Sequence, residues 1–277
     1  MSYENPPLPE GINVSPRSVL AETLWLGAAT ILIVATVAAV VHFGFSRLAR
    51  WVPFATEHAW VGEERVVGVE VTELHDADAL RIRDYLRELG GALAAHMDLP
   101  EGMQLHVHYT DSAVPNAFAT LGGHIVVTSA LYRIMPSENA LATVLAHEIA
   151  HIRARDPIAA LGGGASLALL IALVGGDAGA LAPHVASIIQ RGYSRDAESL
   201  ADAAALAAII AHYGHAGGAD AMFEALAAHR DLADVAIPTL LSTHPVDRER
   251  IARMHAAAVA WDPAAQPLVA LRVAAAP

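Results

Sequence analysis

The most informative stretch of the chain is His147-Glu148-Ile149-Ala150-His151. On an α-helix, residues four positions apart share a face, so the imidazoles of His147 and His151 would point the same way. Two neutral imidazoles at this spacing suit Zn²⁺, and Glu148 would lie close enough to act on a water at the metal. The alternative is a polar helix face with two surface histidines, because so short a motif also occurs by chance.

The residues around this stretch predict the helix that the motif needs. Ser137 follows Pro136 and is a good N-cap, and Glu138 falls in the first turn, where an acidic side chain is favourable. Apolar residues recur at helical spacing from residue 140 to residue 149. We therefore predict a helix that begins after Ser137 and contains both histidines.

The composition limits the classes of function that fit. Hydrophobic residues make up 55% of the 277 residues, which indicates a membrane segment or large buried helices. The net charge is −12 and all 17 basic residues are scattered arginines, which argues against nucleic-acid binding. The chain has no cysteine, so any zinc must be held by His, Asp or Glu.

The N-terminal region predicts a membrane anchor. Residues 1–22 are polar and proline-rich, and we expect them to be disordered. The apolar run that follows is long enough to cross a bilayer, so we predict a transmembrane helix over residues 23–46. Trp25 and Trp51 bracket it, as interfacial residues do.

A cleaved signal peptide is the alternative for this apolar run. It would need a short basic start, whereas the first residues hold Glu4 and Glu10 against Arg17. Arg47 and Arg50 follow the run, which favours a cytoplasmic C-terminal domain by a margin of one arginine.

The rest of the chain predicts an α+β domain, mainly α, over residues 57–262, followed by a tail at 263–277. Strands are expected at 65–74 and 104–109, and a hairpin at 118–128 with Gly122-Gly123 as its two-residue turn. Further helices are expected at 76–97, 194–213, 219–229 and 247–260. Residues 158–190 predict a hydrophobic helical hairpin, which is either buried or in contact with the membrane. The alternative is a second membrane span, because the uncharged apolar run at 158–174 is at the lower limit of length for one.

A second helix offers the remaining metal ligand. A catalytic zinc takes three protein ligands and leaves the fourth position to water. Glu198 and Asp202 lie four residues apart on the helix that follows Ser194, so their carboxylates share a face. One of them could bind zinc while the other accepts the free N–H of a ligating histidine. The alternative is an ordinary acidic first turn.

Together these motifs resemble a known family. Residues 147–151 with Glu198 and Asp202 resemble the HExxH…ExxxD pattern of membrane-linked zinc endopeptidases, the HtpX-like and CAAX prenyl proteases. Three further segments are similar to parts of that family. Asn116-Ala117-Phe118-Ala119 before Gly122-Gly123 resembles the strand and turn that precede the active helix, and residues 151–156 resemble the end of that helix. Ser242-Thr243-His244-Pro245 with Arg250-Ile251 resembles the downstream S-x-HP…RI segment. The resemblance runs from about residue 69 to residue 254. It departs at 203–205, where alanines replace a usual glycine, which concerns helix packing and not the ligands.

The resemblance implies a zincin-like metallopeptidase domain and a membrane-anchored, zinc-dependent endopeptidase that cleaves membrane-associated or misfolded proteins. It implies one Zn²⁺ per chain on His147, His151 and Glu198, with Glu148 as general base and Asp202 as the partner of a ligating histidine. The strand of Asn116, Ala117, Phe118 and Ala119 is expected to pair with an extended peptide substrate. The expected partners are protein or peptide substrates and the lipid bilayer. The alternative is a non-catalytic membrane adaptor, which the intact Glu148 does not favour.

His244 has three candidate roles. Pro245 makes a helix through His244 unfavourable, so we expect it on a loop. Its imidazole could stabilise the oxyanion of the reaction, or it could take the fourth zinc position and keep the enzyme latent until substrate displaces it. The third role is a structural histidine. The histidines at 106, 108 and 124 are expected to be structural or surface residues.

Overall fold

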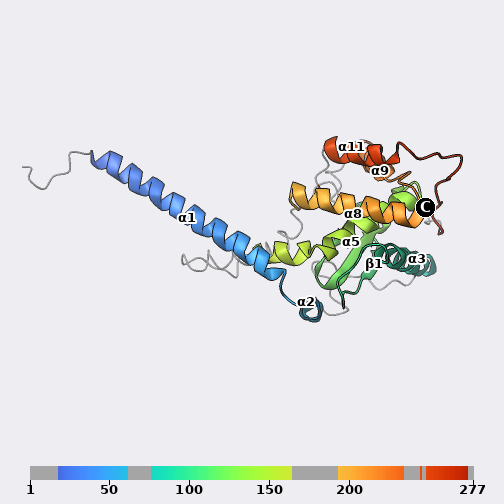
Figure 1. Ribbon diagram of the computed structural model, residues 1–277, viewed down its shortest axis with the longest axis horizontal. Coiled ribbons are helices and arrows are strands. Elements are labelled where there is room, and N and C mark those ends of the chain that lie inside the picture. Colours follow the sequence, from blue (N-terminus) through green and yellow to red (C-terminus); the bar gives the residue numbers. More distant parts are fainter. Residues whose placement is uncertain (1–17, 62–75, 164–192, 234–243, 245–247, 274–277) are drawn as a thin grey trace, which may run out of the picture. The chain divides into compact units, whose positions relative to one another are not determined.

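The computed structural model describes residues 18–61, 76–163, 193–233, 244 and 248–273 (Figure 1). The predicted strand at 65–74, most of the predicted disordered segment and most of the predicted hydrophobic hairpin lie outside these residues. The chain divides into two compact units, Met1–Val41 and His42–Pro277.

Helix α1 (Val19–Ala49) contains the predicted transmembrane segment and extends it at both ends. None of its residues is buried, and its most apolar stretch has a mean hydropathy of 2.4. By length and composition this helix can cross a membrane, although a signal sequence near an N-terminus has the same properties.

The sheet has three strands in the order β1-β3-β2. Strand β1 (His106–Thr110) pairs in parallel with β3 (His124–Thr128), and β2 (Ala117–Ala119) pairs with β3 in the antiparallel direction. The predicted hairpin is thus present as β2 and β3. Strand β2 lies at an edge of the sheet, beside helix α5 (Glu138–Arg153).

The hairpin connection is longer than the two-residue turn predicted. A short 3₁₀ helix, η1 (Leu121–Gly123), fills it, and the N–H of Thr120 donates to the carbonyl of His124 at 2.8 Å. Gly122 and Gly123 have φ values of 72° and 81°, which only glycine adopts readily. A Cβ on Gly123 would lie 2.0 Å from the carbonyl oxygen of Gln104, so this position also requires glycine for space.

Helix α5 is the centre of the second unit. It packs between the sheet on one side and α8 (Arg195–Tyr213) on the other, and it also contacts α3 (Ala77–Ala94) (Figure 1). Every residue of α5 from Glu138 to Ile152 is buried. Its predicted N-cap is present, because the side-chain oxygen of Ser137 accepts a hydrogen bond from the N–H of Ala140 at 3.2 Å. The mainly α fold with a small sheet is therefore confirmed.

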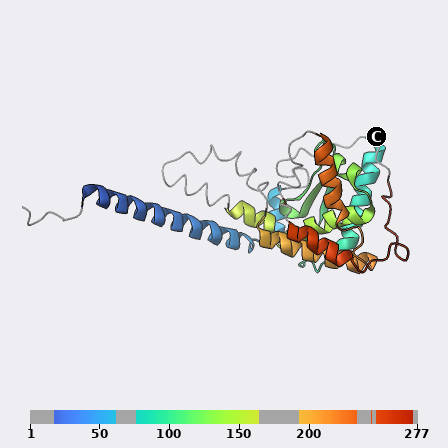
Figure 2. The ribbon, with the colours of Figure 1, turned by 90° about the horizontal axis from the view of Figure 1, so that it is seen from above.

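Shorter helices include α2 (Phe54–Val61), α4 (Ser129–Ile134), α9 (Ala221–Ala233) and α11 (Arg248–Ala258), and a further helical stretch occupies residues 156–163. Helix α11 lies along α8 (Figure 2). After α11, part of the predicted tail packs against the start of α5. There the carbonyl of Val269 accepts from the N–H of Glu138 at 2.8 Å, and the N–H of Val269 donates to the side chain of Asn139 at 2.9 Å.

Four histidines stack on one another at the start of β1 and β3. His106 and His108 lie on β1, His124 on β3 and His58 on α2, with neighbouring ring centroids 4.8–5.8 Å apart. A hydrogen bond of 2.8 Å joins Nε2 of His108 to Nδ1 of His124. Burial lowers the pKa of both His108 and His124 from 6.5 to about 4, with nearby Arg87 and the other histidines acting in the same direction.

This histidine stack predicts a pH dependence of stability. Between about pH 6.5 and pH 4 the unfolded chain binds protons at His108 and His124 that the folded chain does not. The contribution of these two histidines to the free energy of unfolding should therefore fall as the pH is lowered through this range and change no further below it. Denaturant unfolding of the full chain in detergent at several pH values measures the slope. The double variant H108Q/H124Q should flatten it, whereas H96Q, at an exposed histidine, should not. An unchanged slope in the double variant would refute this origin.

Candidate metal centre

Helix α5 brings the two motif histidines together in the interior. His147 and His151 are 3% and 0% exposed, and their rings meet edge to face with centroids 4.7 Å apart. Their Nε2 atoms are 3.1 Å apart. Two imidazole nitrogens this close need a proton or a cation between them, because their lone pairs would otherwise repel each other.

Helix α8 supplies two carboxylates to this pair, in different positions. Glu198 places Oε1 at 3.5 Å from Nε2 of His151 and Oε2 at 3.3 Å from Nε2 of His147. Asp202 instead lies behind His147, with Oδ1 at 3.1 Å from Nδ1. Glu198 therefore faces the same point as the two Nε2 atoms, and Asp202 faces the opposite side of one ring. Of the two assignments left open by the sequence, this geometry favours Glu198 as the ligand.

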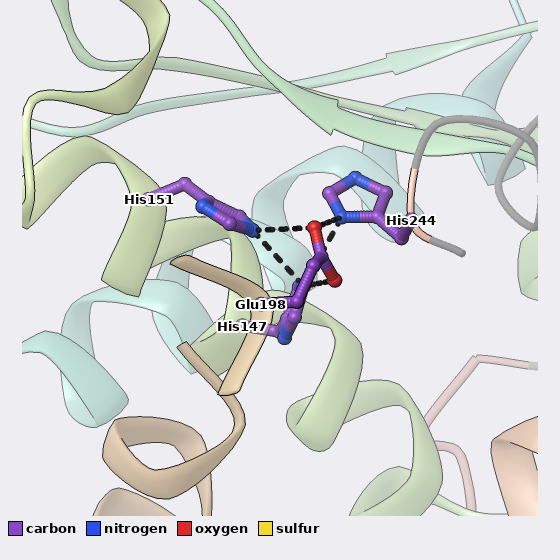
Figure 3. A group of neighbouring side chains, drawn as sticks. All are labelled: His147, His151, Glu198 and His244. Atoms are coloured by element: carbon purple, nitrogen blue, oxygen red, sulfur yellow. Dashed lines mark hydrogen bonds and ion pairs between the residues drawn. The ribbon is translucent and has the colours of Figure 1, made fainter. Parts of the chain in front are cut away.

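His244 joins the same group from a distant part of the chain. Its Nδ1 lies 3.1 Å from Nε2 of His147 and 2.9 Å from Oε1 of Glu198. One ligand atom from each of His147, His151, Glu198 and His244 lies within 4.8 Å of the other three (Figure 3). The flanking residues 241–243 and 245–247 lie outside the described residues, so the predicted loop around His244 is not described.

These four residues offer a donor set for one metal ion. Five separations among the three imidazole nitrogens and the two oxygens of Glu198 run from 2.9 to 3.5 Å, close to the ~3.3 Å between ligands of a tetrahedral ion. With one atom from each residue, the four donors lie within 4.8 Å of one another. Imidazole and carboxylate donors suit zinc and similar transition metals.

Electrostatics favours a cation at the same point. Although burial acts against ionisation, hydrogen bonds from His147, His151 and His244 hold the pKa of Glu198 far below its usual range. Burial likewise disfavours a charged His151, but the carboxylates of Asp156 and Glu198 raise the pKa of His151 to about 9. The cluster thus attracts positive charge, either a proton or a metal ion.

Glu148 lies beside the cluster and is completely buried. Its Oε2 accepts a hydrogen bond from the N–H of Ala119 at 2.8 Å, and its Oε1 lies 3.4 Å from Nε2 of His244. Burial raises the pKa of this carboxyl, with His244 and His151 acting against the rise. A carboxyl with a raised pKa next to a metal position has the properties of a general base.

The predicted substrate strand lies beside Glu148. The carbonyl of Asn116 accepts from the N–H of Thr128 and the N–H of Thr120 donates to the carbonyl of His124, so by alternation Phe118 makes the hydrogen bonds to β3. The N–H and C=O groups of Ala117 and Ala119 then point away from β3, on the side where none of the described strands pairs with β2. On that side the N–H of Ala119 donates to Glu148.

Arg250 is a site residue to which the sequence argument gave no role of its own. It lies on α11, is 2% exposed, and donates to both carboxylate oxygens of Asp202 at 2.7 and 2.8 Å. It also lies 2.7 Å from Oε2 of Glu198. Its single positive charge offsets part of the negative charge of the two carboxylates, and its hydrogen bonds fix their orientation. The only available signal was its position six residues after His244 in the segment that carries the family resemblance.

Two other neighbours of His151 were also missed. Asp156 places Oδ2 at 2.9 Å from Nδ1 of His151. The ring of Tyr193 stacks on the imidazole of His151, with centroids 4.0 Å apart and an angle of 26° between the planes. Both residues directly adjoin predicted features, the end of α5 and the N-cap of α8, but periodicity gives no signal for contacts of this kind.

Comparison with known proteins agrees with this arrangement. Residues 81–258 match peptidase family M48. A protease HtpX homolog of Syntrophobacter fumaroxidans is 30% identical over 241 residues, covering 70% of this chain and 83% of that protein. The HtpX homolog of Ralstonia nicotianae is 30% identical over 249 residues, covering 74% and 84%.

A second group of relatives is similar over a shorter region. The beta-barrel assembly-enhancing protease of Yersinia pestis is 38% identical over 74 residues. These residues make up 27% of this chain, and the chain spans only 15% of the length of that relative.

The family match covers α3 through α11 and so includes all four residues of the metal cluster. The metalloprotease class predicted from the two histidines and Glu198 is thereby confirmed. The chain belongs to peptidase family M48.

Proposed function

We propose that the chain is a zinc-dependent endopeptidase whose metal is held by His147, His151 and Glu198. The observation that carries this proposal is the convergence of their donor atoms, together with one of His244, to within 4.8 Å of one another beside the buried carboxyl of Glu148. The zinc assignment rests on the donor set, since the chain offers imidazole and carboxylate ligands and has no cysteine.

Each residue around this metal position has a separate role in peptide hydrolysis. A zinc ion bound there would polarise the scissile carbonyl and lower the pKa of a water. Glu148 takes the proton of the attacking water and passes it to the leaving amine. Asp202 accepts the Nδ1 proton of His147 and so keeps Nε2 available for the metal. Arg250 holds both Glu198 and Asp202 in place.

The peptide substrate is expected to bind as an added strand on β2. Both backbone groups of Ala117 and the carbonyl of Ala119 point away from β3, on the side where none of the described strands pairs with β2. Main-chain pairing with a sheet edge is a general way to hold an extended peptide. The side-chain oxygen of Asn116 is buried and has no hydrogen-bond partner within the described part of the chain. It is available to accept from the backbone of a bound peptide.

His244 acts in this proposal as a latch, meaning a fourth ligand that closes the metal to substrate. Its Nδ1 lies 3.1 Å from Nε2 of His147 and 2.9 Å from Oε1 of Glu198, which supports a role as fourth ligand in place of the water that a catalytic zinc otherwise binds. Displacement of His244 would open that position. Its Nε2 would then be available as a donor to the oxyanion, so the two roles considered for this residue are compatible.

The proposed substrates are membrane-associated or misfolded proteins. The exposed, apolar α1 supports attachment to a bilayer as a single-pass anchor, and Arg47 in its last turn with Arg50 directly after it favours a cytoplasmic domain. Relatives named beta-barrel assembly-enhancing proteases support a membrane-protein substrate. Cross-linking of substrates trapped by E148Q in membranes would identify them.

The first prediction concerns the general base. E148Q keeps the size of the side chain but removes the proton acceptor, so zinc content should stay the same while casein hydrolysis falls by at least ~100-fold. Zinc analysis and peptidase assays of the full chain in detergent measure both quantities. E224Q, an exposed substitution on α9, is the matched control. Near-normal turnover in E148Q would contradict the assignment.

The second prediction concerns the third ligand. E198A should lose both stoichiometric zinc and activity, because the carboxylate completes the protein's ligand set. D202A should weaken zinc binding by about 10- to 100-fold, because it removes a hydrogen-bond partner of a ligand. D196A, exposed in the first turn of the same helix, should bind zinc normally. Normal zinc binding by E198A would show that another residue is the ligand.

The third prediction concerns His244. If it is a latch, H244A should retain zinc and show raised basal proteolysis, because the fourth position is open. Lost turnover with intact zinc would instead indicate that the oxyanion role dominates. Unchanged kinetics with a lower melting temperature would leave a structural role only and would overturn the latch. H96A, at an exposed histidine, controls for general effects of losing an imidazole.

A further inference from the structure

The chain makes a turn directly after α5, and this turn brings the carboxylate of Asp156 next to His151. Helix α5 ends at Arg153, Arg155 has a φ of 61°, and a new helical stretch occupies residues 156–163. A positive φ is strained for arginine, so surrounding contacts must hold this turn. The result is that Oδ2 of Asp156 lies 2.9 Å from Nδ1 of His151.

This contact fixes the chemical form of His151. Its Nε2 faces the metal cluster, so a metal ligand requires the proton on Nδ1. A carboxylate that accepts the Nδ1 proton holds the ring in this tautomer and makes Nε2 a better donor. Asp156 therefore does for His151 what Asp202 does for His147.

The second oxygen of Asp156 is held from a different part of the chain. Nη2 of Arg50, the residue directly after α1, donates to Oδ1 of Asp156 at 2.8 Å. Asp156 is 4% exposed, whereas the Arg50 side chain is 47% exposed. A buried carboxylate is costly without an opposite charge, so Arg50 stabilises Asp156 in the orientation that His151 needs.

Close packing and hydrogen bonds on both sides keep Arg50 beside Asp156. Gly162 and Gly163 pack closely on the last turns of α1. A Cβ on Gly162 would lie 2.8 Å from the Cβ of Ala49 and from the carbonyl oxygen of Phe45, and a Cβ on Gly163 would lie 2.6 Å from the ring of His42. On the other side, Arg155 donates to the carbonyl of Val52 at 2.6 Å and pairs with Glu57 at 2.7 Å. The segment from 42 to 57 thus contacts the region around Asp156 at two places, residues 162–163 and Arg155.

We infer that Asp156 is a positioning residue for His151 and that Arg50 holds Asp156 in place, so the end of the anchor helix completes the metal site. This inference rests on the proposed zinc function. It means that the affinity for the metal depends on how the juxtamembrane segment at 42–57 is seated on the domain. A change in that segment would be transmitted to His151 through one ion pair and one hydrogen bond.

Zinc affinity of the full chain in detergent, measured by competition with a chelator, tests the inference. D156A should weaken Zn²⁺ binding by about 10- to 100-fold. R50A should weaken it by about 2- to 5-fold, as expected for a half-exposed ion pair. R50K should recover most of that loss. R47A, at an exposed arginine one turn earlier on α1, should bind as wild type.

The double variant R50A/D156A separates positioning from a general structural effect. If Arg50 acts through Asp156, R50A should cause no further loss of affinity in the D156A background. Additive losses, or wild-type affinity in R50A, would overturn the role of Arg50. Wild-type affinity in D156A would overturn the role of Asp156. The Arg50 side chain is half exposed, so R50A should fold even if D156A does not, and its zinc affinity still tests the role of Arg50. Failure of the wild-type chain to bind zinc would overturn the proposed function itself.

Discussion

The structure depends on the complete burial of a helix that carries many polar side chains. Helix α5 is buried from Glu138 to Ile152, so each of its polar groups needs a partner inside the protein. Glu138 accepts from Tyr85 and Tyr213, and the N–H of Ala119 on β2 reaches Glu148. His147 and His151 face carboxylates from α8 and from the turn after α5. The elements around α5 are thus positioned by the groups that they satisfy.

The same requirement explains why the metal centre is assembled from distant segments. His147 and His151 are four residues apart, but Glu198 comes from α8 and His244 from a position beyond α9. Arg250 on α11 then balances the carboxylates of Glu198 and Asp202. Buried charges of this kind are stable only when they are paired, so removal of any one partner should destabilise the positions of the others. The site behaves as one network and not as a set of separate ligands.

Local sequence patterns were sufficient for part of this account. The N-caps Ser137 and Ser194, the spacing of His147 and His151, and the shared face of Glu198 and Asp202 all follow from helix geometry, which acts over a few residues. They gave the helices and the class of site. The family resemblance added His244 and the edge strand.

Contacts between segments far apart in the chain could not be predicted in this way. The pairing of Arg50 with Asp156 joins residues 106 positions apart, and no periodicity indicates it. The sequence argument gave the tail at 263–277 no role, yet the carbonyl of Val269 accepts a hydrogen bond from the N–H of Glu138 at the start of α5. The histidine stack at β1 and β3 depends on strand register, which the separate strand predictions did not specify. These features follow from tertiary packing, where the partner is chosen by the fold.

Diffraction from crystals of the full chain, recorded on both sides of the zinc absorption edge, tests the central claim most directly. The account predicts one anomalous peak per chain, about 2.0–2.2 Å from Nε2 of His147, Nε2 of His151 and a carboxylate oxygen of Glu198. In the latched state Nδ1 of His244 should be the fourth neighbour. Absence of a peak at these residues in protein purified without chelator, or a peak bound elsewhere, would contradict the account.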